Sequence, residues 1–341
     1  MFAVSQIVQR NLHRQKAPGS VLWINPEKDD CWRRLDSTVE PVKLFSQDYG
    51  HHVFFQQAGA NAEFSAFPNA DNAHYGWIIL NLPRQKALLA MLLDCAVALL
   101  ADGGVLWLAG QNKAGIKSAD RLLKKHFRQV RKLDNARHCS LYEASERLQQ
   151  NTFDSHRYGE HWTVNYADSE LRVLSYPGVF AHGRLDKGTE RILEVLPKVD
   201  MHGDILDFAC GTGVIGACIA AHHADTKVTL LDNNALALKA SRETLEANGL
   251  HGTVLASDGL AGVDDSYDVI VSNPPIHAGI KTDNHLGMGL LEQVREHIRP
   301  GGKLILVANV HLPYEKWLKK RFKRLSKLAA DDDFKVIMAT S

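Results

Sequence analysis

The chain has 341 residues, which at roughly 150 residues per domain corresponds to about two domains. It carries 40 Lys and Arg against 39 Asp and Glu, a formal net charge of +1, with 45% hydrophobic and 23% charged residues. This composition is typical of a soluble globular protein. It excludes a disordered tail, a collagen-like fibre and a small disulfide scaffold.

Cysteine usage and the longest apolar run indicate the compartment. The 5 cysteines form no CxxC pair and are odd in number, a pattern that favours reduced thiols in the cytosol. The N-terminus lacks the uninterrupted apolar stretch of a signal peptide. The most apolar run, residues 87–100, is interrupted by Asp94 and is too short to cross a bilayer. We therefore expect a cytoplasmic protein with no membrane partner.

The first half of the chain alternates strand and helix patterns. A predicted strand ends at Asn81-Leu-Pro83, and a predicted helix runs from there to Leu100. A Gly-rich turn, a strand, a basic amphipathic helix and a short strand are then expected at residues 102–104, 105–109, 121–132 and 140–142. The basic helix fits either a solvated helix face or a surface that contacts phosphate groups.

The second half repeats this order, which favours a duplication over a chance similarity of two unrelated domains. A predicted strand ends at Asn273-Pro-Pro275, and Lys319 and Lys320 match Lys124 and Lys125 of the first half. The helix, Pro-Gly-Gly turn, strand, basic helix and short strand are expected at residues 290–298, 300–302, 303–308, 316–327 and 335–338. Strands that alternate with helices specify a mostly parallel sheet with helices on both faces. We therefore predict two tandem α/β domains.

The polar segment after Ala144 has no apolar period and predicts a boundary between the domains. The expected first domain, linker and second domain cover residues 1–145, 146–160 and 161–341. A hairpin over residues 162–166 and 171–175 and a helix that begins near Asp186 or Lys187 are expected at the start of the second domain.

Residues 204–216 predict a buried strand, a Gly-rich turn and the start of a helix. The turn, Gly211-Thr-Gly213-Val-Ile-Gly216, matches the pattern G-x-G-x-x-G. Glycines there permit positive φ and a close approach of a ligand, and the first N–H groups of the helix bind polar groups. Dinucleotide-binding proteins and S-adenosylmethionine-dependent methyltransferases share this pattern.

Two acidic residues follow at the ends of the next predicted strands. Asp232 lies about 20 residues after the first glycine, where a carboxylate accepts both hydroxyls of an adenosine ribose. Asp258 ends a third strand, at a place where it is able to bond an adenine amino group. Either residue has a helix cap or a turn as its alternative role.

The segment Asn273-Pro274-Pro275 at the end of the fourth strand distinguishes the two cofactors. Consecutive prolines fix the backbone and remove two N–H donors, which leaves carbonyl oxygens free to accept hydrogen bonds. With the Asn273 side-chain oxygen they form a rigid pair of acceptors for a planar –NH₂ group. Such a pair favours the pyramidal nitrogen of methyl transfer, whereas hydride transfer has no use for it.

With these motifs the sequence resembles class I S-adenosylmethionine-dependent methyltransferases of the Asn-Pro-Pro-aromatic group. Residues 177–181, 185–193 and 273–277 make it similar to the bacterial 16S ribosomal RNA small subunit methyltransferase C family. That resemblance implies methylation of the exocyclic N2 amine of a guanine, guanine 1207 of 16S rRNA. It also implies two tandem class I methyltransferase domains of the Rossmann-like, seven-stranded type, the N-terminal one degenerate and supporting RNA binding.

The resemblance also implies roles for individual residues. S-adenosyl-L-methionine would contact Asp207, Gly211, Gly213, Asp232, Asn233 and Asp258, and the guanine amine would contact Asn273, Pro274 and Pro275. Substrate contacts are expected, less specifically, from Phe180, Ile276, His277, Lys319 and Lys320. The expected partner is 16S rRNA or the small ribosomal subunit, bound by a monomer without a metal ion.

Three features depart from the family pattern. Ala209 replaces the first glycine of the motif, so we expect its backbone to avoid positive φ. Ile276 replaces the usual aromatic residue, and we expect His277 or Phe180 to supply a stacking face for the base. The first half has no Gly-rich turn after its first strand and no second proline beside Pro83, so no cofactor site is expected there.

Other functions fit parts of the pattern. The same chemistry serves a guanine-N2 methyltransferase of large-subunit rRNA, an adenine-N6 methyltransferase or a protein glutamine methyltransferase. The Gly-rich turn and Asp232 also fit an NAD-dependent oxidoreductase, and a relic fold fits a non-catalytic RNA-binding protein. The 17 histidines form no metal-binding motif and are expected at the surface or at helix caps.

Overall fold

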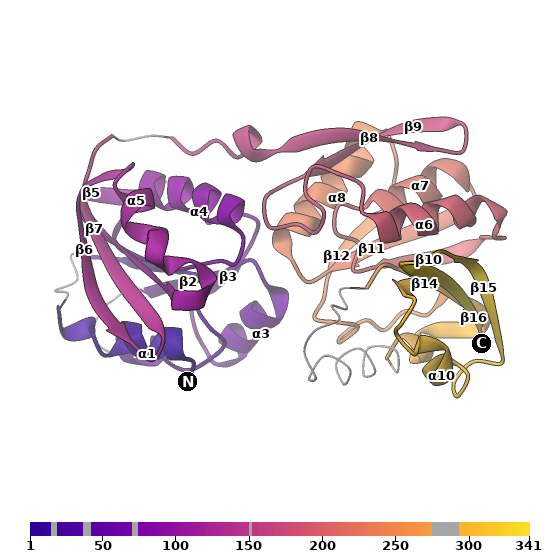
Figure 1. The fold of residues 1–341 in the computed structure, drawn as a ribbon, viewed down its shortest axis with the longest axis horizontal. Helices are drawn as coiled ribbons and strands as arrows, with labels where there is room; N and C mark the ends of the chain where they lie inside the picture. Colours follow the sequence, from indigo (N-terminus) through magenta and orange to yellow (C-terminus); the bar gives the residue numbers. More distant parts are fainter. Residues whose placement is uncertain (15–18, 37–41, 70–73, 150–151, 275–292) are drawn as a thin grey trace. The chain divides into compact units, whose positions relative to one another are not determined.

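Each half of the chain folds into a sheet with helices packed on both faces (Figure 1). The structure is a computed structural model that describes residues 1–14, 19–36, 42–69, 74–149, 152–274 and 293–341. The chain divides into two compact units, Met1–Tyr158 and Gly159–Ser341.

The first unit contains a sheet whose 7 described strands follow the order β3-β2-β1-β4-β5-β7-β6. The strands are β1 (Val21–Ile24), β2 (Val42–Ser46), β3 (Ala62–Phe64), β4 (Tyr75–Asn81), β5 (Leu100–Gln111), β6 (Phe127–Ala136) and β7 (Cys139–Arg147). The α-helices are α1 (Ala3–Gln9), α2 (Trp32–Asp36), α3 (Tyr49–Gln57), α4 (Lys86–Leu99) and α5 (Ala119–Leu123). Strands β1 to β5 are parallel, and β7 is antiparallel to β5 and β6.

The second unit repeats this topology, with its 7 described sheet strands in the order β12-β11-β10-β13-β14-β16-β15. The strands are β10 (Gly203–Phe208), β11 (Thr226–Asp232), β12 (Thr253–Ala256), β13 (Tyr267–Ser272), β14 (Ile298–Asn309), β15 (Arg324–Ala330) and β16 (Phe334–Thr340). A hairpin of β8 (Glu160–Tyr166) and β9 (Ser169–Ser175) precedes them. The α-helices are α6 (Lys187–Val195), α7 (Val214–His222), α8 (Ala235–Ala247) and α10 (Tyr314–Leu318). The matching strand orders confirm the two tandem α/β folds predicted from the sequence.

Side chains of each sheet alternate between two apolar cores, because successive residues of a strand point to opposite faces. In the first unit, Trp23 packs with α1, α2 and α3, whereas its neighbour Leu22 packs with α4 and α5. In the second unit, Ile205 packs with the β8–β9 hairpin, α6 and α7, whereas Leu206 packs with α10. Both faces of each sheet are therefore covered.

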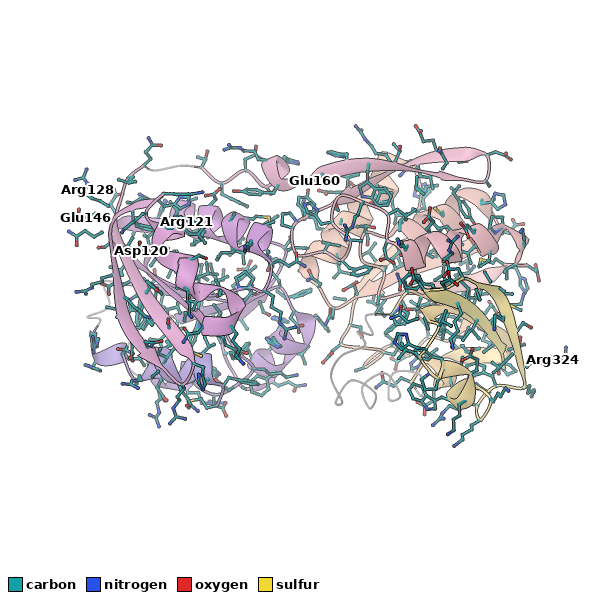
Figure 2. All side chains as sticks on the ribbon, in the orientation of Figure 1. Asp120, Arg121, Arg128, Glu146, Glu160 and Arg324 are labelled. Atoms are coloured by element: carbon teal, nitrogen blue, oxygen red, sulfur yellow. The ribbon has the colours of Figure 1, made fainter. Side chains whose placement is uncertain are left out.

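The two basic segments predicted to be helices are helical only at their first residues and continue into strands, so that prediction is wrong for most of their length. Helix α5 ends at Leu123 and β6 begins at Phe127, while α10 ends at Leu318 and β15 begins at Arg324. Strands β6 and β15 lie at the edges of their sheets, where charged side chains discourage pairing with other chains. Arg128 and Arg324 project away from these edges (Figure 2).

The Gly-rich turns expected at residues 102–104 and 300–302 are also wrong, because both segments lie inside the strands β5 and β14. The register of the adjoining ladder shifts there, and Gly103 and Gly301 adopt φ values of +72° and +81°. The glycines form matching bulges rather than loops. The helix expected over residues 290–298 is described only from Gln293, and Ile298 already belongs to β14.

All five cysteines are buried and none forms a disulfide. Burial raises the pKa of the Cys31 and Cys95 thiols to about 12 and also raises the pKa of Cys139, Cys210 and Cys218. In the described part of the chain, no helix is both long and apolar enough to span a membrane.

Candidate active site

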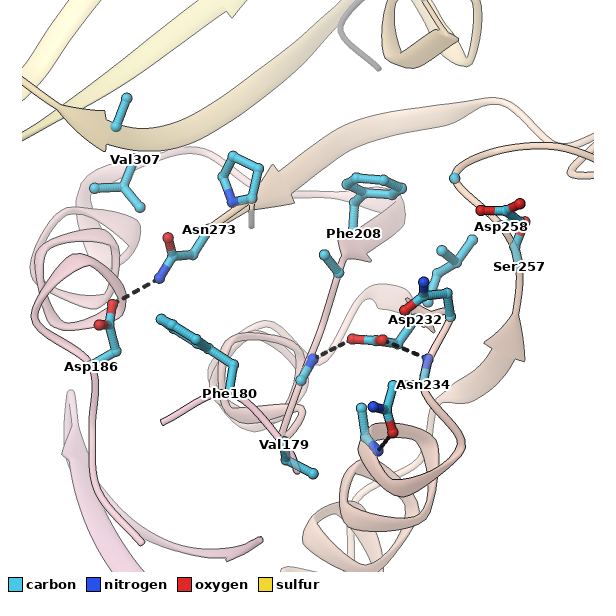
Figure 3. Close-up of a pocket in the computed structure, with 18 of the residues that line it drawn as sticks. Val179, Phe180, Asp186, Phe208, Asp232, Asn234, Ser257, Asp258, Asn273 and Val307 are labelled. Carbon is cyan, nitrogen blue, oxygen red and sulfur yellow. Dashed lines mark hydrogen bonds between the residues drawn. The ribbon is translucent and has the colours of Figure 1, made fainter. Parts of the chain in front are cut away.

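The carboxyl ends of the central strands of the second unit surround a cavity of about 750 Å³. Parallel α/β sheets commonly bind ligands at this edge. Its lining includes Phe180, Asp186, Ala209, Gly211, Asp232, Asn233, Asn234, Asp258, Asn273 and Pro274. In Figure 3, Asp186 and Asn273 lie at one end of this pocket, and Asp232 and Asp258 lie at the other.

The Gly-rich turn connects β10 to α7 through backbone conformations that favour glycine. Gly211 and Gly213 adopt φ values of +56° and +75°, and Gly213 is the N-cap residue of α7. A Cβ atom at Gly211 would meet nothing within 4 Å, so the backbone here is open to a ligand, and Gly211 lines the pocket. Gly213 does not line it.

Ala209 differs from the expectation drawn from its side chain. Its φ is +60°, a left-handed conformation that an L-residue with a Cβ rarely adopts. The prediction that this position avoids positive φ is therefore wrong. The turn keeps the same left-handed bend that a glycine would give, and the backbone bears the strain.

Asp207 is fully buried behind the Gly-rich turn and does not line the pocket. Its Oδ2 accepts a hydrogen bond from the backbone N–H of Gly216 at 2.8 Å, while Oδ1 has no partner in the described structure. Burial raises the pKa of this carboxyl to about 7. The Gly216 hydrogen bond opposes the rise in pKa, and the charge of Asp232 adds to it. The position favours support of the turn from behind.

The end of the pocket opposite Asn273 carries Asp232 and Asp258. The Asp232 carboxylate accepts hydrogen bonds from the backbone N–H groups of Gly211 and Asn234, both at 2.9 Å. Asn234 in turn caps α8 through its side chain. Asn233 and Asp258 line the same part of the pocket from exposed positions. These residues bring a carboxylate, an amide and a second carboxylate to one wall.

Asn273 lies at the end of β13 with its amide orientation fixed. Its Nδ2 donates to Asp186 Oδ2 at 2.8 Å and to Thr189 Oγ1 at 3.0 Å (Figure 3). Its Oδ1 has no hydrogen-bond partner among the described residues. Asn273 and Pro274 both line the pocket, so the amide oxygen is the end of the Asn273 side chain that is left for a ligand.

The sequence pattern did not identify Asp186 and Thr189 as site residues. Asp186 was predicted only as the start of a helix, and it is indeed the N-cap of α6, accepting from the Thr189 N–H at 3.1 Å. The segment 186–189 held the signal that could have identified them. An acidic N-cap residue, Asp186, stands three residues before the hydroxyl of Thr189, and this spacing places two hydrogen-bond acceptors on one helical turn.

The remaining predicted substrate residues occupy different places. Phe180 lines the pocket and is 52% exposed, on a loop fixed by a hydrogen bond between Ser175 Oγ and His182 Nδ1 at 2.9 Å. Lys319 and Lys320 are exposed just after α10 and do not line the pocket. Pro275, Ile276 and His277 lie outside the described residues.

The equivalent positions of the first unit are filled by protein hydrogen bonds. Asn81, which ends β4 as Asn273 follows β13, uses its Oδ1 to accept from the Trp23 indole at 3.0 Å. Asn25 and Gln47 follow β1 and β2, where the second unit has Ala209 and Asn233, and they bond one another through side chain and backbone. Gln47 also donates to the Ala66 carbonyl. These groups point to each other rather than to a ligand.

The second unit's pocket fits S-adenosylmethionine in its donor and acceptor set. The backbone at Gly211 is open to a ligand, the Asp232 carboxylate lines the pocket, and the Asp258 side chain has no hydrogen bond among the described residues. In the described part of the chain, no group of three or more His, Cys, Asp or Glu residues is placed to hold a metal ion.

Comparisons with known families cover nearly the whole chain. Residues 170–338 match the "Methyltransferase small domain" family and residues 5–162 match "Methyltransferase small domain N-terminal". The chain is 36% identical to ribosomal RNA small subunit methyltransferase C of Aeromonas hydrophila, with 99% of this chain and 98% of the relative aligned. It is 40% identical to the protein of the same name from Pseudomonas aeruginosa strain LESB58, over 76% of this chain and 78% of that one.

A solved structure shares the fold of both units. It is the T. thermophilus 16S rRNA N2 G1207 methyltransferase in complex with AdoMet and guanosine, and it matches with a TM-score of 0.85 at 22% identity. The match covers 99% of this chain and 92% of that one. The duplicated architecture therefore exists in a protein with a different sequence.

Proposed function

The chain belongs to the ribosomal RNA small subunit methyltransferase C family and is an S-adenosylmethionine-dependent methyltransferase, and on this premise we propose that it methylates the exocyclic N2 amine of guanine 1207 in 16S rRNA. Membership in a methyltransferase family decides against the NAD-dependent oxidoreductase. We further propose that the catalytic pocket is the one in the second unit.

One observation carries this proposal. Asn273 is held with its amide nitrogen bonded to Asp186 and Thr189 and its oxygen left for a ligand, in the same pocket as Asp232. An amine needs acceptors, and this arrangement supplies an acceptor in a fixed direction. In the first unit, the side-chain oxygen of Asn81 already accepts a hydrogen bond from the Trp23 indole. The asparagine at this position is therefore not free to accept a bond from a ligand.

The chain's own residues then position the amine. Asn273 Oδ1 accepts one N2–H and the Pro274 carbonyl accepts the other, which draws the nitrogen toward a pyramidal geometry with its lone pair exposed. S-adenosylmethionine supplies, when bound, a methyl group on a sulfonium. Asp232, Asn233 and Asp258 would hold its adenosine portion. The methylated ammonium is acidic and loses its proton without a strong base, so catalysis depends on positioning and electrostatics.

We propose that exposed basic residues outside the pocket contact RNA phosphates. In the first unit they run from α5 through the following turn to β6, and in the second they follow α10 and continue into β15. They are Arg121, Lys124, Lys125 and Arg128, and Lys319, Lys320, Lys323 and Arg324. The first unit would then serve RNA binding and structural support. We also propose the cytoplasmic location expected from the sequence, where a ribosomal substrate is found, and the expected monomeric state.

The test is transfer of labelled methyl from S-adenosylmethionine to naked 16S rRNA and to small ribosomal subunits, followed by mapping of the labelled nucleoside. We expect label in guanosine N2 at one position. Asn273→Ala is expected to lower kcat by about 10²-fold or more, the effect of losing one preorganised polar contact in an active site. Asn81→Ala is the matched control, since it removes the same side chain at the equivalent strand end of the other unit.

Other labelled products would redirect the assignment. Label in 23S rRNA would favour a large-subunit substrate, label in adenosine N6 an adenine substrate, and label in a ribosomal protein an amide substrate. Binding of S-adenosylhomocysteine without transfer to any of these would favour a non-catalytic RNA-binding protein.

A further inference from the structure

We propose that Asp186 selects the acceptor base, by accepting the N1–H of guanine while it holds Asn273 in the orientation that receives the N2 amine. This inference rests on the guanine acceptor proposed above. It assigns to Asp186 a specificity role that the Asn-Pro-Pro motif alone does not provide.

Asp186 fixes the orientation of the Asn273 amide. Rotation of that amide by half a turn would place its oxygen against the Asp186 carboxylate, which accepts hydrogen bonds and donates none when ionised. Space around the pair is also restricted. A Cβ atom at Gly188 would lie 3.0 Å from Asp186 Oδ2 and 3.4 Å from Asn273 Nδ2. The absence of a side chain at residue 188 lets the two groups meet.

Asp186 also has one carboxylate oxygen that the protein does not use. Its Oδ2 is used by Asn273 and by the Thr189 N–H, whereas Oδ1 has no hydrogen-bond partner among the described residues. Asp186 lines the pocket, and we infer that this oxygen is the one that a ligand meets there. Together, Asp186 and Asn273 present two acceptors, both oxygens, at one end of the pocket (Figure 3).

Two acceptors at the same end of the pocket match guanine and oppose adenine. The Watson–Crick edge of guanine carries the N1–H donor directly beside the N2 amine. Adenine has a ring nitrogen that accepts hydrogen bonds beside its N6 amine, so its lone pair would face a carboxylate. A site built to bond a donor rejects an analogue that lacks it, because its own polar group is then left unpaired.

The experiment uses RNA with guanine or 2-aminopurine at the nucleotide that the wild-type enzyme methylates. The 2-aminopurine base keeps the 2-amino group but replaces N1–H by an acceptor nitrogen. We expect wild-type kcat/KM to be lower for 2-aminopurine by on the order of tenfold to a hundredfold, the value of one hydrogen bond to a charged group. Asp186→Asn keeps an N-capping side chain and is expected to lower kcat for guanine and to shrink this ratio toward one.

Glu190→Gln is the matched control, because it makes the same change from carboxylate to amide on the exposed side of α6, one turn away. It should leave both the rate and the ratio unchanged. Equal wild-type transfer to the two bases, or an undiminished ratio in a folded Asp186→Asn enzyme, would overturn the inference. If the variant does not fold, the wild-type ratio decides. Absence of wild-type transfer to any guanine would instead overturn the proposed function.

Discussion

At the scale of single residues, Ala209 is a strained position in the turn that faces the pocket. An alanine at φ +60° is disfavoured relative to glycine by about 1–2 kcal/mol, of which about 0.4–1 kcal/mol is offset by the greater freedom of glycine in the unfolded chain. We expect Ala209→Gly to stabilise the second unit by about 0.5–1 kcal/mol. The measurement is thermal unfolding. The transition whose temperature rises when S-adenosylhomocysteine is added belongs to the second unit, and its temperature is compared between the two proteins. A lower transition temperature in the variant would show that Ala209 is not strained.

Asp207 makes stability depend on pH. Its pKa is raised to about 7 in the folded chain, so between about pH 4 and about pH 7 the folded state binds a proton that the unfolded state has lost. The free energy of unfolding should therefore fall as pH rises through that window and level off above it. Each pKa unit is worth about 1.4 kcal/mol.

Asp207→Asn isolates this contribution, because an amide keeps the acceptor for Gly216 and does not titrate. Denaturant unfolding of both proteins at a series of pH values should show the wild type losing stability relative to the variant from about pH 4 to about pH 7. Parallel pH profiles would mean that the buried carboxyl titrates like an exposed one.

At the scale of elements, helix α7 packs against β11 through Gly216. A Cβ atom there would lie 2.8 Å from Leu230 side-chain atoms and 3.2 Å from Asp207 Oδ2. We expect Gly216→Ala to destabilise the second unit by about 1–3 kcal/mol, the usual effect of overpacking, and to weaken S-adenosylhomocysteine binding by moving the turn. Calorimetry and titration measure the two effects. Ala220→Ser adds one atom at a partly exposed position of the same helix and should change neither.

The sequence predicted the elements whose pattern is strong and missed those decided by distant contacts. The strand–turn–helix around Gly211 and the order of strands were readable because period and glycine spacing are local. The strands β6 and β15 were mistaken for helices because their basic residues lie in runs. Their position at the edge of each sheet, which depends on pairing with distant strands, explains the charged residues. Asp186 was invisible as a site residue because its partner Asn273 is 87 positions away.

At the scale of the whole molecule, the duplication leaves one open site and one filled with side chains. The Asn25–Gln47 and Trp23–Asn81 hydrogen bonds occupy the equivalent edge of the first unit. We expect isothermal titration to give one S-adenosylhomocysteine per chain, with binding lost in Asp232→Asn. Ser46→Ala changes the residue that ends β2 as Asp232 ends β11, and should leave binding intact. A second binding event that survives Asp232→Asn would place a functional site in the first unit.

The burial of every native cysteine leaves the folded surface without a reactive thiol, since thiolates are the nucleophiles and burial suppresses them. If one cysteine were introduced at an exposed position of each unit, these two thiols would therefore be the only ones to react with a maleimide dye. The wild-type chain is thus a ready background for fluorescence energy transfer between the two units, and the distance between them becomes measurable while RNA binds.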